Sequence, residues 1–339
     1  MKKVRVAING LGRIGRAFLK IAIERSEIEL VAVNDLGDLE NLAYLLRYDS
    51  AYGRFKLPVA VKDNKLVVNG QEIIVCKEKE PAKLPWASLQ IDVVVESTGF
   101  FTSYQAAKAH LDAGARKVVV SAPVKGEPVP GVGSATVLMG INEEKLATCQ
   151  ITSNASCTTN AASPLIQILH EAIGIEKALL NTVHGYTASQ KLVDSPDAKD
   201  FRRGRAAAAN IIPSTTGAAE AVTQAISSLA GRFDGIAMRV PVITGSIVDL
   251  TFLAKRPTNV SEINKILKEA AQVERWKHHF ATTEEPLVSA DIVGSPYASI
   301  ADLTLTKVVA DNLVKVMAWY DNEMGYTHTL VQHVIKTGQ

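Results

Sequence analysis

Short apolar runs alternate with helical periodicities through the first half of the chain. Residues 4–8 predict a buried strand, 13–24 a helix and 28–33 a second strand, an order that implies a right-handed crossover between parallel strands. The same alternation predicts a helix at 106–113 and further strands at 92–96, 117–121, 135–139 and 150–153. The pattern indicates an α/β domain built on a parallel sheet.

One segment of this half has a different pattern. Apolar residues at 66–68 and 73–75 flank Asn69-Gly70, the dipeptide favoured in a two-residue type I′ turn. We predict a β-hairpin here and interpret it as an excursion from the main sheet.

The second half carries longer alternating runs and fewer helices. A helix is predicted at 158–172, followed by strands at 176–186, 235–242, 246–255 and 313–320 and helices at 217–229, 261–271 and 324–336. Long strands with few helices between them favour an antiparallel or mixed sheet, and hence a second domain of the α+β class. We therefore expect two domains, residues 1–156 with 321–339 and residues 157–320.

Composition and charge narrow the function. The 339 residues are 47% hydrophobic and 21% charged, as in an ordinary globular protein, and the net charge is only +2. This balance provides no basic field for nucleic acid or an anionic membrane, and no apolar run approaches the ~20 residues of a membrane span. The three cysteines form no CxxC pair, which favours a reducing, cytoplasmic location over a disulfide scaffold.

A glycine motif lies between the first strand and the first helix. Gly10, Gly12 and Gly15 form G-x-G-x-x-G, which allows a tight turn, close approach of a pyrophosphate and helix–strand packing. Asp35 ends the second strand, where a carboxylate binds the ribose hydroxyls of NAD and repels the 2′-phosphate of NADP. The motif predicts a Rossmann-type NAD domain. The alternatives are glycines that serve packing alone, with Asp35 as a helix cap, or another Rossmann ligand such as FAD.

Cys157 is the candidate nucleophile. It follows small polar residues between a strand and an apolar helix, so it falls at or near a helix N-terminus, where the dipole and free N–H groups stabilise a thiolate and could bind an oxyanion. A buried structural cysteine is the alternative from position alone. His184, late in the strand 176–186, is the best partner, because an imidazole near the thiol lowers its pKa and exchanges protons. The other histidines lack ligand spacing, so we predict no metal site.

Two local anion sites are predicted despite the small net charge. Thr216 and Gly217 precede a helix whose N–H groups suit a phosphate, and Arg239 ends a strand. Residues 185–210 have no clear period and contain Lys191, Lys199, Arg202, Arg203 and Arg205. Two separated sites suit a phosphorylated substrate and a free phosphate. For Arg203 and Arg205, salt bridges between domains or subunits are an equal alternative.

Six segments, in order along essentially the whole chain, resemble phosphorylating glyceraldehyde-3-phosphate dehydrogenases. They are NGLGRIGR at 9–16, SNASCTTN at 153–160, HGYT at 184–187, IIPSTTGAA at 211–219, MRVP at 238–241 and WYDNE at 319–323. The resemblance implies that Cys157 attacks the aldehyde of glyceraldehyde 3-phosphate and that His184 takes the proton. It further implies that hydride transfer to NAD leaves a thioester, which inorganic phosphate releases as 1,3-bisphosphoglycerate.

The resemblance also implies roles for other residues. Besides the glycine loop, it implies cofactor contacts from Arg13, Ile14, Asp35, Ser121 and Asn322. It implies substrate-phosphate contacts from Thr187 and Arg239, and inorganic-phosphate contacts from Ser156, Thr158, Thr216 and Gly217. The family forms homotetramers in which the loop carrying Pro196 packs at a subunit interface, and Leu36 and Pro196 match its NAD-preferring pattern.

The chain departs from the family pattern at three places. Ala161 stands where the family usually has a second cysteine, and Gly185 where it usually has Ser or Ala after the histidine. After Pro241 the family usually reads Thr-Pro-Asn-Val-Ser, and this chain reads VITGS at 242–246. Two other functions stay open: erythrose-4-phosphate dehydrogenase, a relative that usually lacks the Thr-Gly-Ala-Ala turn present here, and a non-catalytic NAD-binding redox sensor.

Overall fold

A computed structural model describes residues 2–198 and 200–339. Lys199, one of the basic residues of the irregular loop, lies outside the described residues. The chain divides into two compact units. The first runs to Ala155 and takes up the chain again at Thr327, and the second comprises Ser156–Tyr326.

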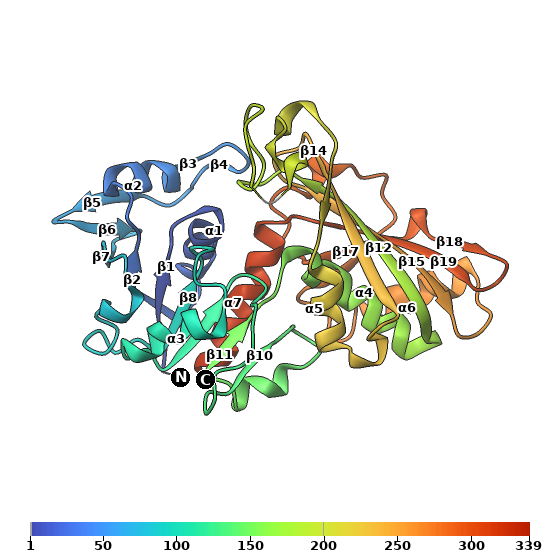
Figure 1. The fold of residues 1–339 in the computed structure, drawn as a ribbon, viewed down its shortest axis with the longest axis horizontal. Helices are drawn as coiled ribbons and strands as arrows, with labels where there is room; N and C mark the ends of the chain where they lie inside the picture. Colours follow the sequence, from blue (N-terminus) through green and yellow to red (C-terminus); the bar gives the residue numbers. More distant parts are fainter. Residues whose placement is uncertain (1, 199) are drawn as a thin grey trace. The chain divides into compact units, whose positions relative to one another are not determined.

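The first unit is built on a sheet of nine described strands in the order β10-β11-β9-β8-β1-β2-β7-β6-β5 (Figure 1). All neighbours from β10 to β7 pair in parallel, as expected for a Rossmann-type domain. The strands are β1 (Val4–Asn9), β2 (Ile28–Asn34), β5 (Val59–Lys62), β6 (Lys65–Val68), β7 (Gln71–Cys76), β8 (Val93–Glu96), β9 (Lys117–Val120), β10 (Ser134–Thr136) and β11 (Ile151–Ser153).

The hairpin prediction is right about the turn and wrong about the sheet. Asn69 and Gly70 have φ values of 50° and 81°, as a type I′ turn requires, and β6 pairs antiparallel with β7. However, β7 also pairs in parallel with β2, with Ile74 opposite Ala32. The hairpin therefore extends the main sheet. Periodicity shows which residues are buried, and it does not show which edge a strand joins.

Four helices accompany this sheet: α1 (Arg13–Ala22), α2 (Leu39–Arg47), α3 (Tyr104–Asp112) and the C-terminal α7 (Met324–Gly338). The sequence analysis did not predict α2, which Asp38 caps by accepting a hydrogen bond from the Asn41 N–H at 2.9 Å. In α7, His333 bonds to the Thr152 hydroxyl of β11 at 2.8 Å, which holds this late segment on the first unit. Short elements complete it: β3 (Tyr48–Asp49), β4 (Gly53–Arg54) and 3-10 turns at Pro81–Lys83 and Glu143–Ala147.

The second unit contains a sheet of eight described strands in the order β13-β14-β12-β15-β19-β17-β16, with β18 also paired to β19. β12 pairs in parallel with β14 and antiparallel with β15, so the sheet is mixed. The predicted fold class, a parallel nucleotide-binding domain followed by an α+β domain, is confirmed. The strands are β12 (Ile175–Gly185), β13 (Ile212–Thr215), β14 (Phe233–Val240), β15 (Ser246–Ala254), β16 (Phe280–Thr283), β17 (Ser299–Asp302), β18 (Lys307–Val309) and β19 (Leu313–Tyr320).

The helices of the second unit are α4 (Cys157–Ile173), α5 (Ala218–Ala225) and α6 (Val260–Ala270). The predicted helix at 217–229 is shorter than expected, because α5 ends at Ala225 and a 3-10 turn follows at Ser227–Leu229. Between β12 and β13 the aperiodic loop contains 3-10 turns at Phe201–Gly204 and Ala207–Ala209. Two more turns lie at Ser289–Ile292 and Leu303–Leu305.

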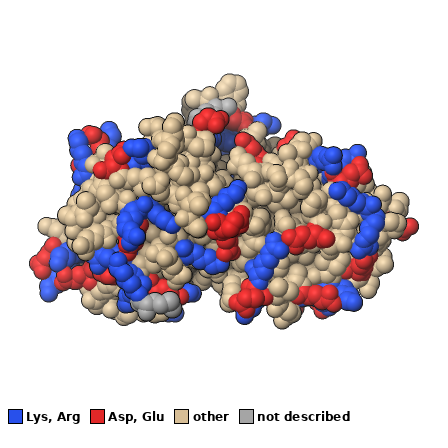
Figure 2. All heavy atoms as spheres, turned by 90° about the horizontal axis from the view of Figure 1, so that it is seen from below, with Lys and Arg blue, Asp and Glu red and all other residues tan. Residues whose placement is uncertain are grey.

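Acidic and basic side chains lie side by side over the face seen in Figure 2, without a large area of one sign. The described residues form several exposed ion pairs, such as Lys265 with Glu269 and Lys268 with Glu284. Within the described part of the chain, no helix is long and apolar enough to cross a membrane.

Candidate active site

The glycine motif forms the turn between β1 and α1. Gly10 has a φ of +96°, and a Cβ there would lie 2.8 Å from the Thr98 nitrogen, so both backbone angle and space require glycine. A Cβ on Gly15 would lie 1.9 Å from the Gly10 carbonyl oxygen, which shows how closely α1 packs on the turn. At Gly12, the N-cap of α1, a Cβ would meet nothing within 4 Å. Packing therefore explains two of the three glycines and leaves the middle one open to a ligand.

Asp35 follows directly after β2, and its side chain is fixed by the backbone. One carboxylate oxygen accepts from the Leu11 N–H at 2.7 Å and the other from the Gly37 N–H at 2.8 Å. The alternative that Asp35 caps the next helix is wrong, because Asp38 caps α2. The carboxylate is thus tied to the glycine turn.

A buried network joins the carboxyl ends of the neighbouring strands. The Asn9 amide donates to Glu96 at 2.6 Å and accepts from Asn34 at 2.7 Å, linking β8, β1 and β2. The Trp86 indole donates to Nδ1 of His110 at 3.0 Å, so Nε2 carries the proton that faces Glu96, also at 3.0 Å. His110 is therefore a buried core residue whose two ring nitrogens both have partners.

A hollow of about 680 Å³ opens at this edge of the sheet. Ligand sites of doubly wound domains lie at the carboxyl ends of the strands, and this volume is within the usual range for small-molecule sites. Its lining includes Gly10, Gly12, Asp35, Leu36, Thr98 and Phe100.

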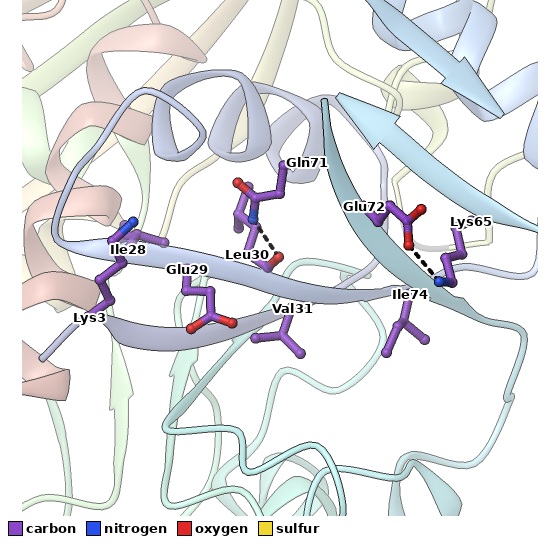
Figure 3. A pocket seen from close by; sticks show the side chains of 9 residues that line it. All are labelled: Lys3, Ile28, Glu29, Leu30, Val31, Lys65, Gln71, Glu72 and Ile74. Atoms are coloured by element: carbon purple, nitrogen blue, oxygen red, sulfur yellow. Dashed lines mark hydrogen bonds and ion pairs between the residues drawn. The ribbon is translucent and has the colours of Figure 1, made fainter. Parts of the chain in front are cut away.

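A second hollow lies at the opposite ends of β2 and β7 and is shown in Figure 3. Its charged rim is already paired: Lys65 binds Glu72 at 2.6 Å, and Arg5 binds Glu29 at 2.5 Å. The Gln71 amide donates to the Leu30 carbonyl at 2.9 Å. The lining also includes Lys3 and Ile28, and we assign no ligand to this hollow.

Three other residues predicted to contact the cofactor are Arg13, Ile14 and Ser121. Arg13, at the first position of α1, pairs with Asp49 at 2.7 Å and lies over the Tyr52 ring. Ile14 is half-buried next to it in the helix, and Ser121 follows β9. These observations neither require nor oppose a cofactor contact.

Cys157 is the first residue of α4. Ser156 is its N-cap, and the Ser156 hydroxyl accepts from the Thr159 N–H at 3.0 Å. The positive end of the helix dipole and the first N–H groups therefore surround the sulfur. The sequence placed the cysteine at or near a helix start, and this position is confirmed. Cys76 and Cys149 are also free thiols, half-buried in β7 and buried after a 3-10 turn.

The structure brings His184 to the cysteine. Nε2 of His184, in β12, lies 3.3 Å from Sγ of Cys157, which is hydrogen-bonding distance for sulfur. On the other side of the ring, Nδ1 lies 2.6 Å from the Gly185 carbonyl oxygen and 2.6 Å from Nη1 of Arg239. The tautomer with a proton on Nδ1 donates to Gly185 and leaves Nε2 able to accept the thiol proton.

The charge states differ from the sequence-based expectation. Burial raises the pKa of the Cys157 thiol, and the Arg239 cation and the Thr158 N–H offset only part of that effect. The prediction of a lowered thiol pKa is therefore wrong for this structure, because desolvation outweighs the helix dipole and the nearby cation. Burial, and then the Arg239 cation, lower the pKa of His184 to about 3, so its imidazole is neutral at neutral pH.

Tyr320 is a site residue to which the sequence analysis assigned no role. Its ring packs edge-on against the His184 ring with centroids 5.8 Å apart. Its hydroxyl bonds to Thr158 at 2.9 Å and to Thr182 at 2.7 Å, linking α4, β12 and β19. Tyr320 is one of the buried positions in the alternating pattern of β19, and nothing in the sequence indicated its partners.

The predicted anion contacts lie on separate elements. Thr187 follows β12, and its hydroxyl bonds to Ser189 at 2.9 Å, whereas Arg239 lies in β14 beside His184. The Thr216 hydroxyl accepts from the Ala218 N–H at 3.2 Å at the start of α5, whose N-cap is Gly217. The Thr158 hydroxyl, by contrast, is engaged by Tyr320.

Basic residues of the long loop have local partners. Arg205 pairs with Asp194 at 3.1 Å and Arg202 with Asp200 at 3.2 Å, both within the loop. Arg203 donates to the Ser214 hydroxyl at 3.2 Å. Among residues 2–198 and 200–339, no group of three His, Cys, Asp or Glu residues could hold a metal ion.

Comparison with known proteins agrees with this arrangement. Residues 4–104 match the glyceraldehyde 3-phosphate dehydrogenase NAD binding domain, and residues 156–322 match the C-terminal domain of the same enzyme. The chain is 49% identical to glyceraldehyde-3-phosphate dehydrogenase of Clostridium acetobutylicum over 333 residues, covering 97% of this chain and 96% of the relative. It is 48% identical to the enzyme of Geobacillus stearothermophilus over 330 residues, again covering 97% and 96%.

The likeness extends to a eukaryote. Glyceraldehyde-3-phosphate dehydrogenase 1 of Kluyveromyces lactis is 45% identical over 335 residues, covering 98% of this chain and 99% of the relative. Full-length identity at this level, together with both domain matches, establishes the family. The chain belongs to the glyceraldehyde-3-phosphate dehydrogenase family.

Proposed function

We propose that this protein oxidises D-glyceraldehyde 3-phosphate to 1,3-bisphosphoglycerate with NAD and inorganic phosphate, as in glycolysis and gluconeogenesis. The observation that carries the proposal is the 3.3 Å contact between Cys157 Sγ and His184 Nε2 at the start of α4. A nucleophilic cysteine with an adjacent base is what a covalent aldehyde oxidation requires. The relatives are named for glyceraldehyde 3-phosphate, so erythrose 4-phosphate and a non-catalytic sensor are not favoured.

In this mechanism Cys157 attacks the aldehyde carbon, and its proton passes to Nε2 of His184. The N–H groups at the start of α4 stabilise the oxygen of the thiohemiacetal. NAD, when bound, supplies the hydride acceptor that converts the thiohemiacetal to a thioester. His184 first returns the thiol proton to the thiohemiacetal oxygen, which gives the hydroxyl, and Nε2 takes the proton again as the hydride leaves. Inorganic phosphate then attacks the thioester carbon and displaces the Cys157 thiolate, which gives the acyl phosphate.

The residues of the first unit suit NAD. Gly12 leaves open space where a pyrophosphate would approach the N-terminus of α1, and Gly10 and Gly15 shape the turn. Asp35 holds a fixed carboxylate for the ribose hydroxyls, and Leu36 is exposed beside it. We assign further cofactor contacts to Arg13, Ile14, Ser121 and Asn322. The corresponding domains are residues 1–156 with 321–339 for NAD and 157–320 for catalysis.

We assign the two phosphate sites to different residues. Arg239 and Thr187 bind the phosphate of the substrate, and Nη1 of Arg239 lies 2.6 Å from Nδ1 of His184. Ser156, Thr158, Thr216 and Gly217 bind inorganic phosphate, for which the exposed N-cap Gly217 of α5 supplies backbone N–H groups. For Thr158 the backbone is the better donor, because its hydroxyl bonds to Tyr320.

We further propose a cytoplasmic homotetramer. The loop between β12 and β13 exposes three large apolar side chains, Leu192, Val193 and Phe201, at 84%, 69% and 87%. Exposed apolar groups of this size on a long loop are typical of a protein interface. The three free cysteines suit a reducing compartment. Sedimentation of the purified protein tests the tetramer.

The test of function is NADH absorbance with NAD and glyceraldehyde 3-phosphate, with and without inorganic phosphate. We expect sustained NADH formation by the wild type only with phosphate, none by Cys157→Ser, and wild-type rates from the matched control Cys76→Ser. If folded, NAD-bound wild type gave no turnover, the proposal would be wrong, and erythrose 4-phosphate would be the next substrate to test.

A further inference from the structure

Residues 242–246, of which 242–245 depart from the family pattern, lie against Asn322. The Asn322 side chain is 4% exposed, and its Oδ1 faces three donors from this segment. The Ser246 hydroxyl lies at 2.9 Å, the Gly245 N–H at 3.1 Å and the Thr244 hydroxyl at 3.3 Å. Because a backbone N–H can only donate, the atom that faces Gly245 must be the amide oxygen.

This arrangement also orients the other end of the amide. Nδ2 of Asn322 makes no hydrogen bond to the residues that the structure describes, so its two N–H groups are available to a ligand. We propose that Thr244, Gly245 and Ser246 are positioning residues that hold the Asn322 oxygen inward and so present its N–H groups to the carboxamide of the cofactor. This inference rests on the proposed role of Asn322 as a cofactor contact.

The geometry of the segment is specific to its sequence. Gly245 has a φ of +92°, and a Cβ there would lie 2.4 Å from the Ser289 carbonyl oxygen. Valine, the usual family residue at this place, would not fit that backbone. Thr244 also lies 3.0 Å from the Asp321 carboxylate, which in turn accepts from the N–H groups of Glu323 and Met324. The segment therefore fixes both Asn322 and the start of α7.

The same segment is linked to the strand of the base. The Gly185 N–H donates to the Ser246 hydroxyl at 3.2 Å, and that hydroxyl donates onward to Asn322. The Tyr186 N–H donates to the Val242 carbonyl at 3.0 Å. A side chain at Gly185 would lie 2.8 Å from that carbonyl oxygen, so two departures from the family pattern, Gly185 and residues 242–245, are in contact. The missing side chain at Gly185 leaves room for the backbone of residues 242–245.

The test measures cofactor affinity by quenching of tryptophan fluorescence. Loss of one donor to a buried amide oxygen should weaken NAD binding about tenfold in Ser246→Ala. The loss should be smaller in Thr244→Val, because the single hydroxyl proton of Thr244 also serves the nearer Asp321 carboxylate. Thr244→Ser, which keeps the hydroxyl, should restore wild-type affinity. Thr251→Val is the matched control, because among the described residues the Thr251 hydroxyl has a hydrogen bond to Asp249 of the same strand and to no other group. Its NAD affinity should be unchanged.

A double-substitution cycle separates positioning from a general structural effect. If Ser246 acts through Asn322, the variant Ser246→Ala/Asn322→Ala should bind NAD no more weakly than Asn322→Ala alone. Ser246→Ala should also weaken the 3-acetylpyridine analogue, which keeps the carbonyl group. It should leave the 3-aminopyridine analogue, which lacks that group, unaffected.

Two results would overturn the inference: additive losses in the double variant, or NAD affinities of Ser246→Ala and Thr244→Val equal to that of the wild type. The alkylation rate of Cys157 without cofactor serves as a check on folding and should be the same in the wild type and Thr244→Val. If the wild type binds NAD and turns over triose phosphate, and these variants behave in the same way, the positioning role is rejected and the proposed function stands. A wild type that binds no NAD would reject both.

Discussion

Nη1 of Arg239 lies 2.6 Å from Nδ1 of His184, on the side of the ring opposite the atom that faces Cys157. A guanidinium N–H can donate only to an unprotonated Nδ1, whereas the Gly185 carbonyl can accept only from a protonated Nδ1. The two contacts therefore favour different tautomers of His184. An anionic substrate group that binds Arg239 would remove its contact with Nδ1. Nδ1–H would then donate to Gly185, and Nε2 would be left as the proton acceptor. Arg239, proposed to bind the substrate, thus also lies where it can determine which tautomer His184 adopts.

The first prediction concerns Arg239→Gln. Burial and Arg239 together lower the pKa of His184 to about 3, and the neutral imidazole is the form that we propose as the base. Removing the cation raises that pKa, so the acid limb of kcat/KM should move to higher pH than in the wild type. We also expect kcat/KM for glyceraldehyde 3-phosphate to fall about 100-fold, because a charge-assisted contact is lost. Arg239→Lys should keep the position of the acid limb. If the acid limb of kcat/KM in Arg239→Gln lay at the same pH as in the wild type, Arg239 would not set the pKa of His184.

The second prediction concerns the Cys157 thiol. Burial raises its pKa, whereas the Arg239 cation acts in the opposite direction. Without cofactor, the alkylation rate should therefore keep rising with pH past the ordinary thiol pKa of about 8.5. In Arg239→Gln the rise should come at still higher pH, because the cation that favours the thiolate is gone. Iodoacetamide kinetics between pH 6 and pH 10, roughly bracketing that value, measure both. A wild-type rate that is already constant below neutral pH would show that the helix N-terminus outweighs desolvation.

The third prediction concerns Gly185→Ala, a change toward the usual family residue. A Cβ here would lie 2.8 Å from the Val242 carbonyl oxygen and 3.4 Å from that of Ile243. The backbone must shift to accept it, which should cost about 1–3 kcal/mol of stability. Thermal unfolding measures the loss, and activity should fall because His184 is the preceding residue. Unchanged melting temperature and kcat would mean that residues 242–245 adapt freely.

The fourth prediction concerns acid stability and His333. Burial lowers the pKa of His333 to about 3, and its ring bonds to Thr152 at 2.8 Å and Asn154 at 3.0 Å. The folded state keeps this ring neutral, whereas the unfolded chain takes up a proton below about pH 6.5. Its contribution to stability is therefore present above pH 6.5 and is lost as pH falls toward about 3. Urea unfolding of His333→Gln should be less sensitive to pH over this window. If the free energy of unfolding had the same pH dependence in the variant and the wild type, His333 would not contribute to the loss of stability in acid.

Much of the fold follows from local pattern. The burial period of β19 and the βαβ unit around Gly10 are determined by neighbouring residues, so their elements were predicted within a few positions. The pairing of β7 with β2 and the helix α2 were not predicted. Pairing depends on which strand edge is free. The helix α2, in contrast, does have a sequence signal, because its buried residues Leu39, Leu42, Ala43 and Leu46 follow the helical period after the Asp38 cap.

The amino-acid sequence was sufficient to identify the family and the nucleotide motif, and to propose Cys157 and His184 as nucleophile and base. These depend on residue type and on order along the chain. Only the tertiary structure decided what surrounds them: the 27 positions between Cys157 and His184 become a 3.3 Å contact, and Tyr320 joins the pair from a distant strand. It also decided the charge state of the thiol, because desolvation depends on three-dimensional burial. The tertiary structure also shows the place of residues 242–246. In the sequence they are only a departure from the family pattern, whereas in the fold they surround the Asn322 oxygen.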